Sequence, residues 1–292
     1  MSASELVVCV GDNCVDVTQS SHRDPADGDG AAAAAPPVQL AGGNAFNVAV
    51  ALARMGRRAS YLGAVGDDPE AELIVSAAVA AGVDTSRVER MPGSTGRTVV
   101  DHDPDGERRF VSEEYGVAAD YRIDPETATW LARAGWLHFA RQADLADWGS
   151  ALREGGAAMS CDLGHGGGVA MLGDVAPVVD VTFMSASSAA GLTPEQMMRC
   201  ALDAGARLVV VTLGARGSIA ASPDAQWQMD ATPVARVIDT LGAGDAYIAA
   251  FIAARMEDKG IEEAMRAGSR AGAAACTQWG PTGPVTSDGV LA

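Results

Sequence analysis

Lysine is almost absent from this chain of 292 residues: of its 21 basic residues, only Lys259 is a lysine. It lies in the charged stretch 257–260, which is typical of the exposed end of a helix. P-loop NTPases, protein kinases and Schiff-base enzymes each need a lysine in a defined motif or a buried site. The position of Lys259 therefore excludes these three classes. The hydrolase motif G-x-S-x-G is missing as well.

Positive charge is also scarce, because 38 acidic residues outnumber 21 basic ones and give a net charge of −17. This balance excludes a general role in binding nucleic acid or an anionic membrane surface. A phosphate ligand is still compatible with it, provided that backbone N–H groups hold the phosphate.

Paired cysteines, clustered histidines and long apolar runs are lacking too. The five cysteines are scattered without a C-x-x-C pair, which favours free thiols in the cytosol. The four histidines never fall at metal-ligand spacing, so we expect no zinc site. No apolar run approaches a bilayer span, and residues 1–10 lack the basic segment of a signal peptide. We therefore expect a cytoplasmic protein with no membrane segment.

Short apolar runs alternate with helical patterns along most of the chain, which predicts an α/β fold with a mainly parallel sheet. Strands are expected at Leu6–Val10, Tyr61–Val65, Trp136–Phe139, Ala158–Leu163, Val179–Met184 and Arg207–Leu213. Helices are expected at Ala45–Met55, Glu70–Ala81, Glu126–Ala134, Leu145–Arg153, Pro194–Asp203, Ala246–Met256 and Ile261–Thr277. Gly56 and Gly82 follow two of these helices directly, as helix stops commonly do.

Two segments break the alternation. The β-like runs Arg97–His102 and Glu107–Val111 flank the turn 103–106, which predicts a hairpin in a small β domain. The stretch 20–37, rich in Asp, Gly and Ala, predicts a loop inserted between two β elements.

The segment Asp239–Asp245, Asp-Thr-Leu-Gly-Ala-Gly-Asp, carries the strongest chemical signal. Its glycine-rich turn opens into a helix that begins near Ala243. The N–H groups of Gly242, Ala243 and Gly244 are expected to converge at the positive end of that helix and form an anion hole without lysine. Asp245 in the first turn can accept a hydroxyl proton, or it can simply cap the helix.

Two other glycine segments add to this signal. Gly214 and Gly217 follow the apolar run that ends at Leu213, and they either let a nucleotide approach the backbone or form an ordinary turn. Gly42 and Gly43 precede a helix with asparagines one turn apart, Asn44 and Asn47. Their amides can read sugar hydroxyls, although Asn44 can also be only an N-cap.

Taken together, these segments resemble the PfkB, or ribokinase-like, family of ATP-dependent small-molecule kinases. The two family signatures correspond to Gly42–Met55 and Asp239–Asp245. Within the family, the chain resembles the fructoselysine 6-kinase branch through residues 11–16, 42–50, 66–68, 116–120 and 211–214. The resemblance implies a ribokinase-like three-layer sandwich forming a single kinase domain over 1–292. A small β lid would come from about 13–43 and 92–115.

The resemblance also implies roles for individual residues. Asp245 would be the catalytic base, and Gly242, Ala243 and Gly244 the anion hole. The sugar would be bound by Asp16, Gly42, Gly43 and Asn47, and ATP by Thr212, Gly214 and Gly217. Asp239 and the loop 276–280 would hold a monovalent cation such as K⁺, beside the Mg²⁺ that accompanies ATP. The lid would close over the sugar and can pair with the lid of a second copy.

One departure from the family pattern leaves alternatives open. Many members carry N-x-x-E after the strand expected at Val179–Met184, but the stretch 185–190 holds neither the asparagine nor the acid. The first interpretation is a kinase that phosphorylates a primary hydroxyl of a sugar or fructosamine. The second is a ribokinase- or fructokinase-like enzyme for a free sugar. The third is a catalytically weak sugar- or nucleotide-binding protein of the same fold.

Overall fold

A computed structural model describes residues 5–19, 38–102, 108–140, 144–164, 168–188 and 191–281. The expected insertion at 20–37 and the expected hairpin turn at 103–106 lie outside the described residues. Within the described part, no helix combines the length and the apolar character needed to cross a membrane.

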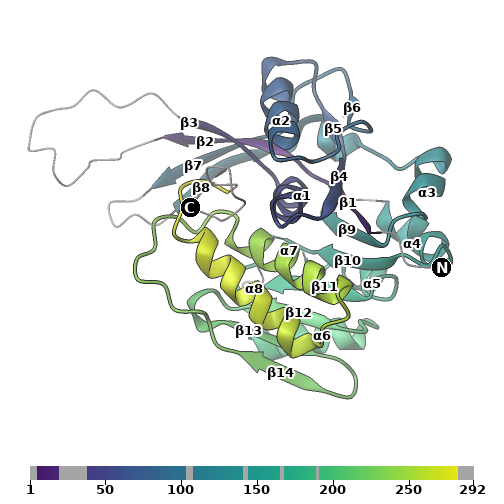
Figure 1. Cartoon of the computed structure of the whole chain (residues 1–292), viewed down its shortest axis with the longest axis vertical. Coiled ribbons are helices and arrows are strands. Elements are labelled where there is room, and N and C mark those ends of the chain that lie inside the picture. The colour runs from purple at the N-terminus through teal and green to yellow at the C-terminus, as the bar shows by residue number, and fades with distance from the viewer. Residues whose placement is uncertain are drawn as a thin grey trace, which may run out of the picture.

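An eight-stranded sheet forms the centre of the molecule (Figure 1). Its strands in spatial order are β14 (Gln226–Met229), β13 (Ser218–Ala221), β12 (Val209–Thr212), β11 (Val181–Ser185), β10 (Ala158–Asp162), β9 (Trp136–Ala140), β1 (Leu6–Gly11) and β4 (Arg58–Leu62). The run from β12 to β4 is parallel throughout, and β13 and β14 add an antiparallel edge. The predicted, mainly parallel sheet is therefore confirmed.

The predicted strand Tyr61–Val65 was wrong as a single element, because the chain bends at Gly63. Strand β4 ends at Leu62, and the next two residues form β5 (Ala64–Val65), which pairs with β6 (Glu89–Arg90) in a separate sheet. A Cβ on Gly63 would lie 2.5 Å from the carbonyl oxygen of Gly11. Glycine thus lets the chain leave the main sheet where β1 ends.

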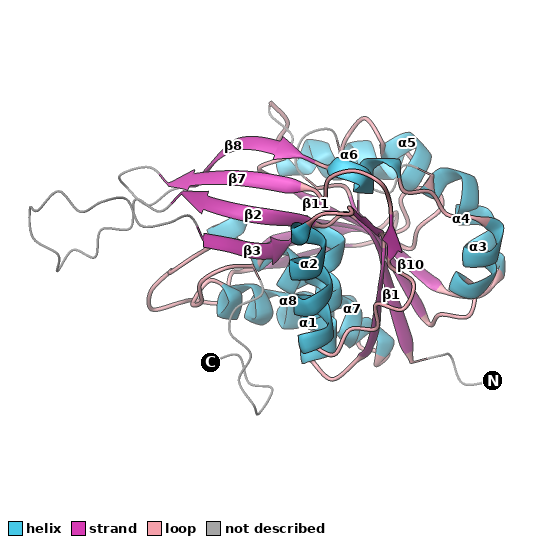
Figure 2. Ribbon diagram, turned by 90° about the horizontal axis from the view of Figure 1, so that it is seen from above, coloured by secondary structure: helices cyan, strands magenta, loops and turns pink. Residues whose placement is uncertain are grey.

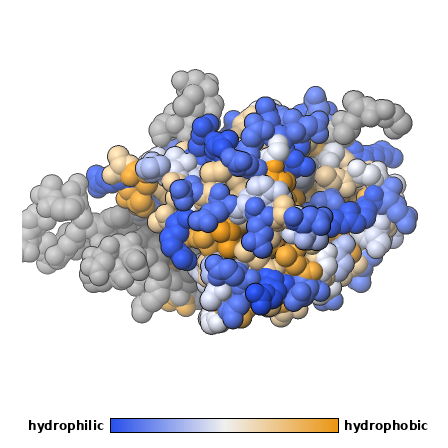
Figure 3. Space-filling view, turned by 90° about the horizontal axis from the view of Figure 1, so that it is seen from below, coloured by the Kyte–Doolittle hydropathy of each residue, from blue (hydrophilic) through white to orange (hydrophobic). Residues whose placement is uncertain are grey.

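Helices cover both faces of the sheet and complete the expected three layers (Figure 2). One face carries α1 (Asn44–Arg54), α2 (Pro69–Ala80), α7 (Ala243–Met256) and α8 (Ile261–Ala275). The other carries α3 (Pro125–Leu131), α4 (Leu145–Glu154), α5 (Leu172–Val175) and α6 (Pro194–Asp203). Short 3₁₀ turns lie at Gly116–Asp120 and Gly214–Arg216. Figure 3 shows that hydrophilic residues dominate one outer face of the molecule, with smaller hydrophobic patches between them.

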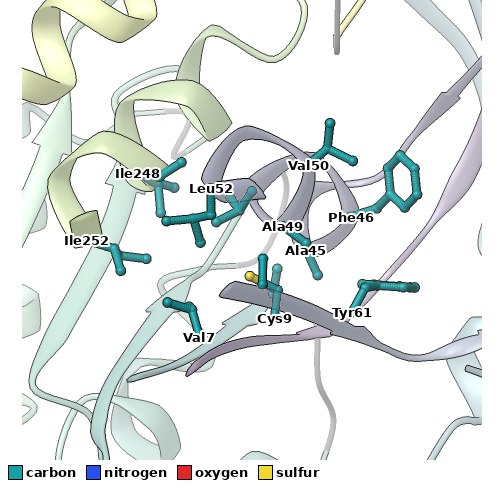
Figure 4. Packing of buried hydrophobic residues seen from close by; sticks show 14 of the residues in the cluster. Val7, Cys9, Ala45, Phe46, Ala49, Val50, Leu52, Tyr61, Ile248 and Ile252 are labelled. Atoms are coloured by element: carbon teal, nitrogen blue, oxygen red, sulfur yellow. The ribbon is translucent and has the colours of Figure 1, made fainter. Parts of the chain in front are cut away.

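The core explains why β1 reads as an uninterrupted apolar run. Residues Val7–Val10 are fully buried, because parallel strands are covered on both faces. On one face, α1 lies over the sheet with Ala45 and Ala49 toward Cys9, and its Leu52 lies toward Ile248 of α7 (Figure 4). This packing fixes α1 and α7 beside each other above the sheet.

Helix ends follow local chemistry. Gly56 and Gly82 adopt positive φ values of 79° and 84° after α1 and α2, which confirms them as helix stops. Helices α3 and α8 end earlier than expected, because the last residues predicted for each form turns in which an N–H bonds to the carbonyl oxygen three residues before it. Ala134 N–H donates to Leu131 beyond α3, and Thr277 N–H donates to Ala274 beyond α8.

A second, four-stranded sheet extends from the main body (Figure 2). Its order is β3 (Val38–Gly42), β2 (Cys14–Gln19), β7 (Arg97–His102) and β8 (Arg108–Glu114). The antiparallel pairing of β7 with β8 confirms the expected hairpin, although β8 runs three residues further than predicted. Strands β2 and β3 are the two β elements expected on either side of 20–37.

Candidate active site

The site lies where the carboxyl ends of parallel strands meet the amino-terminal ends of two helices, the usual ligand position of such sheets. Asp12 follows β1, and Asp162 ends β10. Asn44 and Asn47 lie in the first turn of α1, and Asp245 lies in the first turn of α7. Hydrogen bonds between these side chains show that segments far apart in the sequence converge here.

The amino-terminal end of α7 is shaped by Gly242. This residue adopts φ 74°, and a Cβ on it would lie 2.4 Å from the carbonyl oxygen of Pro281, so only glycine fits without strain. Asp239 anchors the same turn: its carboxylate accepts the N–H groups of Leu241 and Gly280, both at 2.9 Å. The turn is therefore held against the segment that follows α8.

The first turn of α7 presents backbone N–H groups to open space. A Cβ on Gly244 would meet no atom within 4 Å. Among the described residues, the N–H groups of Gly242, Gly244 and Asp245 have no hydrogen-bond acceptor, whereas Ala243 N–H lies 3.3 Å from the Thr240 carbonyl oxygen. Three open amides at the positive end of a helix can hold an anion.

Asp245 lies in the first turn of α7, and its side chain is engaged by another helix. The N-cap is Gly242, without a side-chain bond, while the Asp245 Oδ2 accepts a 2.8 Å hydrogen bond from Nδ2 of Asn47. Asp245 is therefore not the N-cap residue, and it stands in the first turn, where an acidic side chain interacts favourably with the helix dipole. It lies beside the open amides of its own turn.

Burial raises the pKa of the Asp245 carboxyl well above its usual range. The hydrogen bond from Asn47 acts against this rise, and the nearby charges of Asp162, Asp12 and Asp16 add to it. A carboxylate with a raised pKa is a stronger base, which suits the removal of a proton from a hydroxyl group.

Asp12, which lies 32 residues before Asn44 in the sequence, caps helix α1. The two carboxylate oxygens of Asp12 accept the N–H groups of Asn44 at 3.2 Å and Ala45 at 3.1 Å. The N-cap residue itself is Gly43, so the interpretation of Asn44 as an N-cap is wrong. The Asn44 side chain instead donates to Asp162 Oδ2 at 3.2 Å.

The double glycine makes room for Asp16, which is 4% exposed on β2. A Cβ on Gly42 would lie 2.2 Å from Asp16 Oδ2, so a larger residue would displace that carboxylate. Gly43 has φ 110°, and a Cβ there would lie 2.4 Å from the Cα of Asn13. Two of the predicted sugar-binding residues, Gly42 and Asp16, thus depend sterically on each other.

The predicted nucleotide segment lies at the end of β12. The hydroxyl of Thr212 donates to the Met184 carbonyl oxygen at 3.4 Å. Gly214 has φ 60°, and a Cβ there would meet open space. Gly217 has φ 93°, and a Cβ added there would lie 2.0 Å from the carbonyl oxygen of Met229 on β14, so only glycine fits at this position. Gly217 therefore shapes the edge of the sheet.

Sequence reasoning missed Asp12 and Asp162. Each directly follows or ends a buried strand at the carboxyl edge of the sheet. An acidic residue after an apolar run is the signal that marks both positions, since the carboxyl ends of neighbouring parallel strands share one edge.

Within the described ranges, no three His, Cys, Asp or Glu side chains lie close enough to hold a metal ion. After β11, where N-x-x-E is missing, the hydroxyls of Ser185 and Ser187 lie 2.8 Å apart. Mg²⁺ commonly binds through substrate phosphates together with one or two carboxylates, so these hydroxyls leave the phosphates of ATP as its main ligands there.

Comparisons with known proteins identify the family. The pfkB family carbohydrate kinase profile matches residues 4–288. The fructoselysine 6-kinase of Escherichia coli is 32% identical over 249 residues, which cover 85% of this chain and 88% of the relative. Fructosamine kinase FrlD of Bacillus subtilis is 28% identical over 280 residues, covering 95% and 93%.

Solved structures agree with this family. The Arabidopsis thaliana ribokinase complexed with ribose and ATP superposes with a TM-score of 0.80 at 25% identity, over 97% of this chain and 96% of that one. The ribokinase-like fold expected from residues 42–55 and 239–245 is confirmed. The chain belongs to the PfkB family of carbohydrate kinases and is an ATP-dependent sugar kinase.

Proposed function

We propose that this sugar kinase transfers the γ-phosphoryl group of ATP to a primary hydroxyl of a fructosamine, with Asp245 as the base. One observation carries the proposal: the Asp245 carboxylate, held by Asn47, lies in the same helical turn as three open backbone N–H groups. A base and an anion site are then adjacent, as an in-line transfer from phosphate to hydroxyl requires.

The transfer needs alignment and charge stabilisation more than covalent catalysis. The open N–H groups of Gly242, Gly244 and Asp245, at the positive end of α7, bind the transferring phosphoryl group. The Asp245 carboxylate accepts the proton from the sugar hydroxyl. Its raised pKa makes it a better base, and Asn47 holds it in the orientation that meets the substrate.

The sugar lies against Asp16, Gly42, Gly43 and Asn47. Asn47 is 5% exposed, and its Oδ1 has no hydrogen-bond partner among the described residues. A buried acceptor without a partner is costly unless a ligand supplies the donor. A sugar hydroxyl bound there supplies that donor and supports the placement of the substrate.

ATP binds along Thr212, Gly214 and Gly217. Bound Mg²⁺ neutralises phosphate charge during the transfer. K⁺ binding near Asp239 stays a prediction, and both Asp239 carboxylate oxygens also accept backbone N–H groups.

The sheet β3-β2-β7-β8 acts as a lid over the sugar, and its outer strands offer edges through which a second copy can pair.

Two observations favour a fructosamine over a neutral sugar. Relatives named for fructoselysine and fructosamine match at 28–32% identity over at least 85% of this chain. The negative charges of Asp12, Asp16 and Asp162 act on Asp245 at the site, and this acidic surrounding favours a substrate that carries a protonated amine. Asp245 beside open amides also favours an enzyme over a protein that only binds sugar.

The test is ADP release with purified enzyme and a panel of fructoselysine, fructose, ribose and nucleosides. We expect fructoselysine to give the highest kcat/KM. A higher kcat/KM for free fructose or ribose would transfer the assignment to a free-sugar kinase. If the protein binds a sugar but releases no ADP with any member of the panel, it is a sugar-binding protein and not a kinase.

A further inference from the structure

Two asparagines on one face of α1 each hold a carboxylate from another part of the chain. Asn44 Nδ2 donates to Asp162 Oδ2 at 3.2 Å, and Asn47 Nδ2 donates to Asp245 Oδ2 at 2.8 Å. The spacing of three residues places both amides on the same side of the helix. The first turn of α1 therefore links the end of β10 to the beginning of α7.

Asp162 is held in a defined orientation. Its Oδ1 accepts the N–H of Gly164 at 3.0 Å, while its Oδ2 faces Asn44. Strand β10 lies between β9 and β11 in the middle of the sheet, so the backbone that carries Asp162 is fixed on both sides. Asp162 is half-buried and meets α1 at the Asn44 side chain, whereas Asp12 accepts backbone N–H groups at the start of that helix.

Accepting the proposed role of Asp245, we propose that Asp162 is a positioning residue for proton transfer: through Asn44 it fixes the first turn of α1, and thereby the Asn47 amide that holds the Asp245 carboxylate.

The charge of Asp162 acts on the same group. Asp245 is faced by Asp162 from β10, by Asp12 from the turn after β1, by Asp16 from β2 and by the neutral amide of Asn47 from α1. Each of these three negative charges disfavours ionisation of Asp245 and raises its pKa. Replacing Asp162 by a neutral residue of the same shape therefore lowers the pKa of Asp245 and makes it a weaker base.

The variant Asp162→Asn keeps the size of the side chain and removes its charge. We expect kcat to fall about 3- to 10-fold at neutral pH, because both the orientation and the strength of the base are reduced. The KM for ATP stays unchanged. Activity rises as Asp245 loses its proton, so a lower pKa moves the acidic limb of the kcat–pH profile to lower pH.

Three further measurements separate positioning from a general structural effect. Asp203→Asn, at the exposed end of α6, is the matched control and should leave both kcat and the pH limb unchanged. Asp162→Glu restores the charge and should return the acidic limb toward its original pH. Asn44→Ala combined with Asp162→Asn should cost less than the sum of the two single effects, because both act through one contact. A carboxyl ¹³C NMR titration follows Asp245 directly in wild type and Asp162→Asn.

Unchanged kcat and an unchanged limb in Asp162→Asn would overturn the proposal. A loss of kcat with the limb and the NMR pKa of Asp245 both unmoved would also overturn it, since that pattern indicates only a structural defect. If wild-type protein releases no ADP with any sugar, the proposed function fails and this proposal fails with it. An active wild type beside a fully active Asp162→Asn refutes this proposal alone.

Discussion

Replacing Gly42 by alanine tests whether Asp16 binds the sugar. A Cβ at position 42 would lie 2.2 Å from Asp16 Oδ2, well inside the 3.4 Å at which ordinary contacts begin. Gly42 has an ordinary negative or extended φ, so alanine adds no backbone strain and the clash is the whole perturbation. The carboxylate must move by about 1 Å to relieve it, and a displacement of that size can reduce catalysis about 100-fold.

The assay is steady-state kinetics of Gly42→Ala with the sugar varied at saturating ATP. We expect kcat/KM for the sugar to fall 10- to 100-fold, while the KM for ATP is unchanged. Gly173→Ala is the matched control, because a Cβ there meets no atom within 4 Å and should leave the kinetics intact. A folded Gly42→Ala variant with wild-type kcat/KM for the sugar would refute the role given to Asp16.

Three other predictions concern stability. Asp12→Ala leaves the first two N–H groups of α1 without acceptors and should lower the free energy of unfolding by about 1–2 kcal/mol, measured by urea denaturation. Gly242→Ala combines a left-handed φ with a Cβ 2.4 Å from the Pro281 carbonyl oxygen, so it should lower the melting temperature; an unchanged value would contradict the geometry of this turn. Burial lowers the pKa of His138 from 6.5 to about 3, so the unfolded chain binds the extra proton between these values. Stability should therefore fall as pH drops from 6.5 toward 3, by up to about 1.4 kcal/mol per unit, and less steeply in His138→Gln.

Local patterns predicted the frame of the fold well. Buried strands such as β1 are continuous apolar runs, and helices such as α6 begin at a proline after a capping threonine. The bend at Gly63 was missed, because its cause is the close approach of Gly11 from another strand. Strand β14 was missed because it is short and has alternating exposure at the edge of the sheet.

The chemistry of the site was only partly predictable. The segment Asp239–Asp245 predicted a base and an anion site from the sequence alone, because the residues proposed for both lie within one turn. The partners of Asn44 and Asn47 could not be found this way, since they lie 118 and 198 residues further along the chain. Only the folded sheet shows that Asp162 belongs to the site.

The most direct test of the account is the rate of phosphoryl transfer by Asp245→Asn, measured with fructoselysine beside ATP binding by calorimetry. We predict that the variant binds ATP with the wild-type Kd while its kcat falls at least 100-fold, because the open N–H groups are retained and the base is lost. Turnover at the wild-type rate would show that Asp245 takes no proton and would contradict the mechanism.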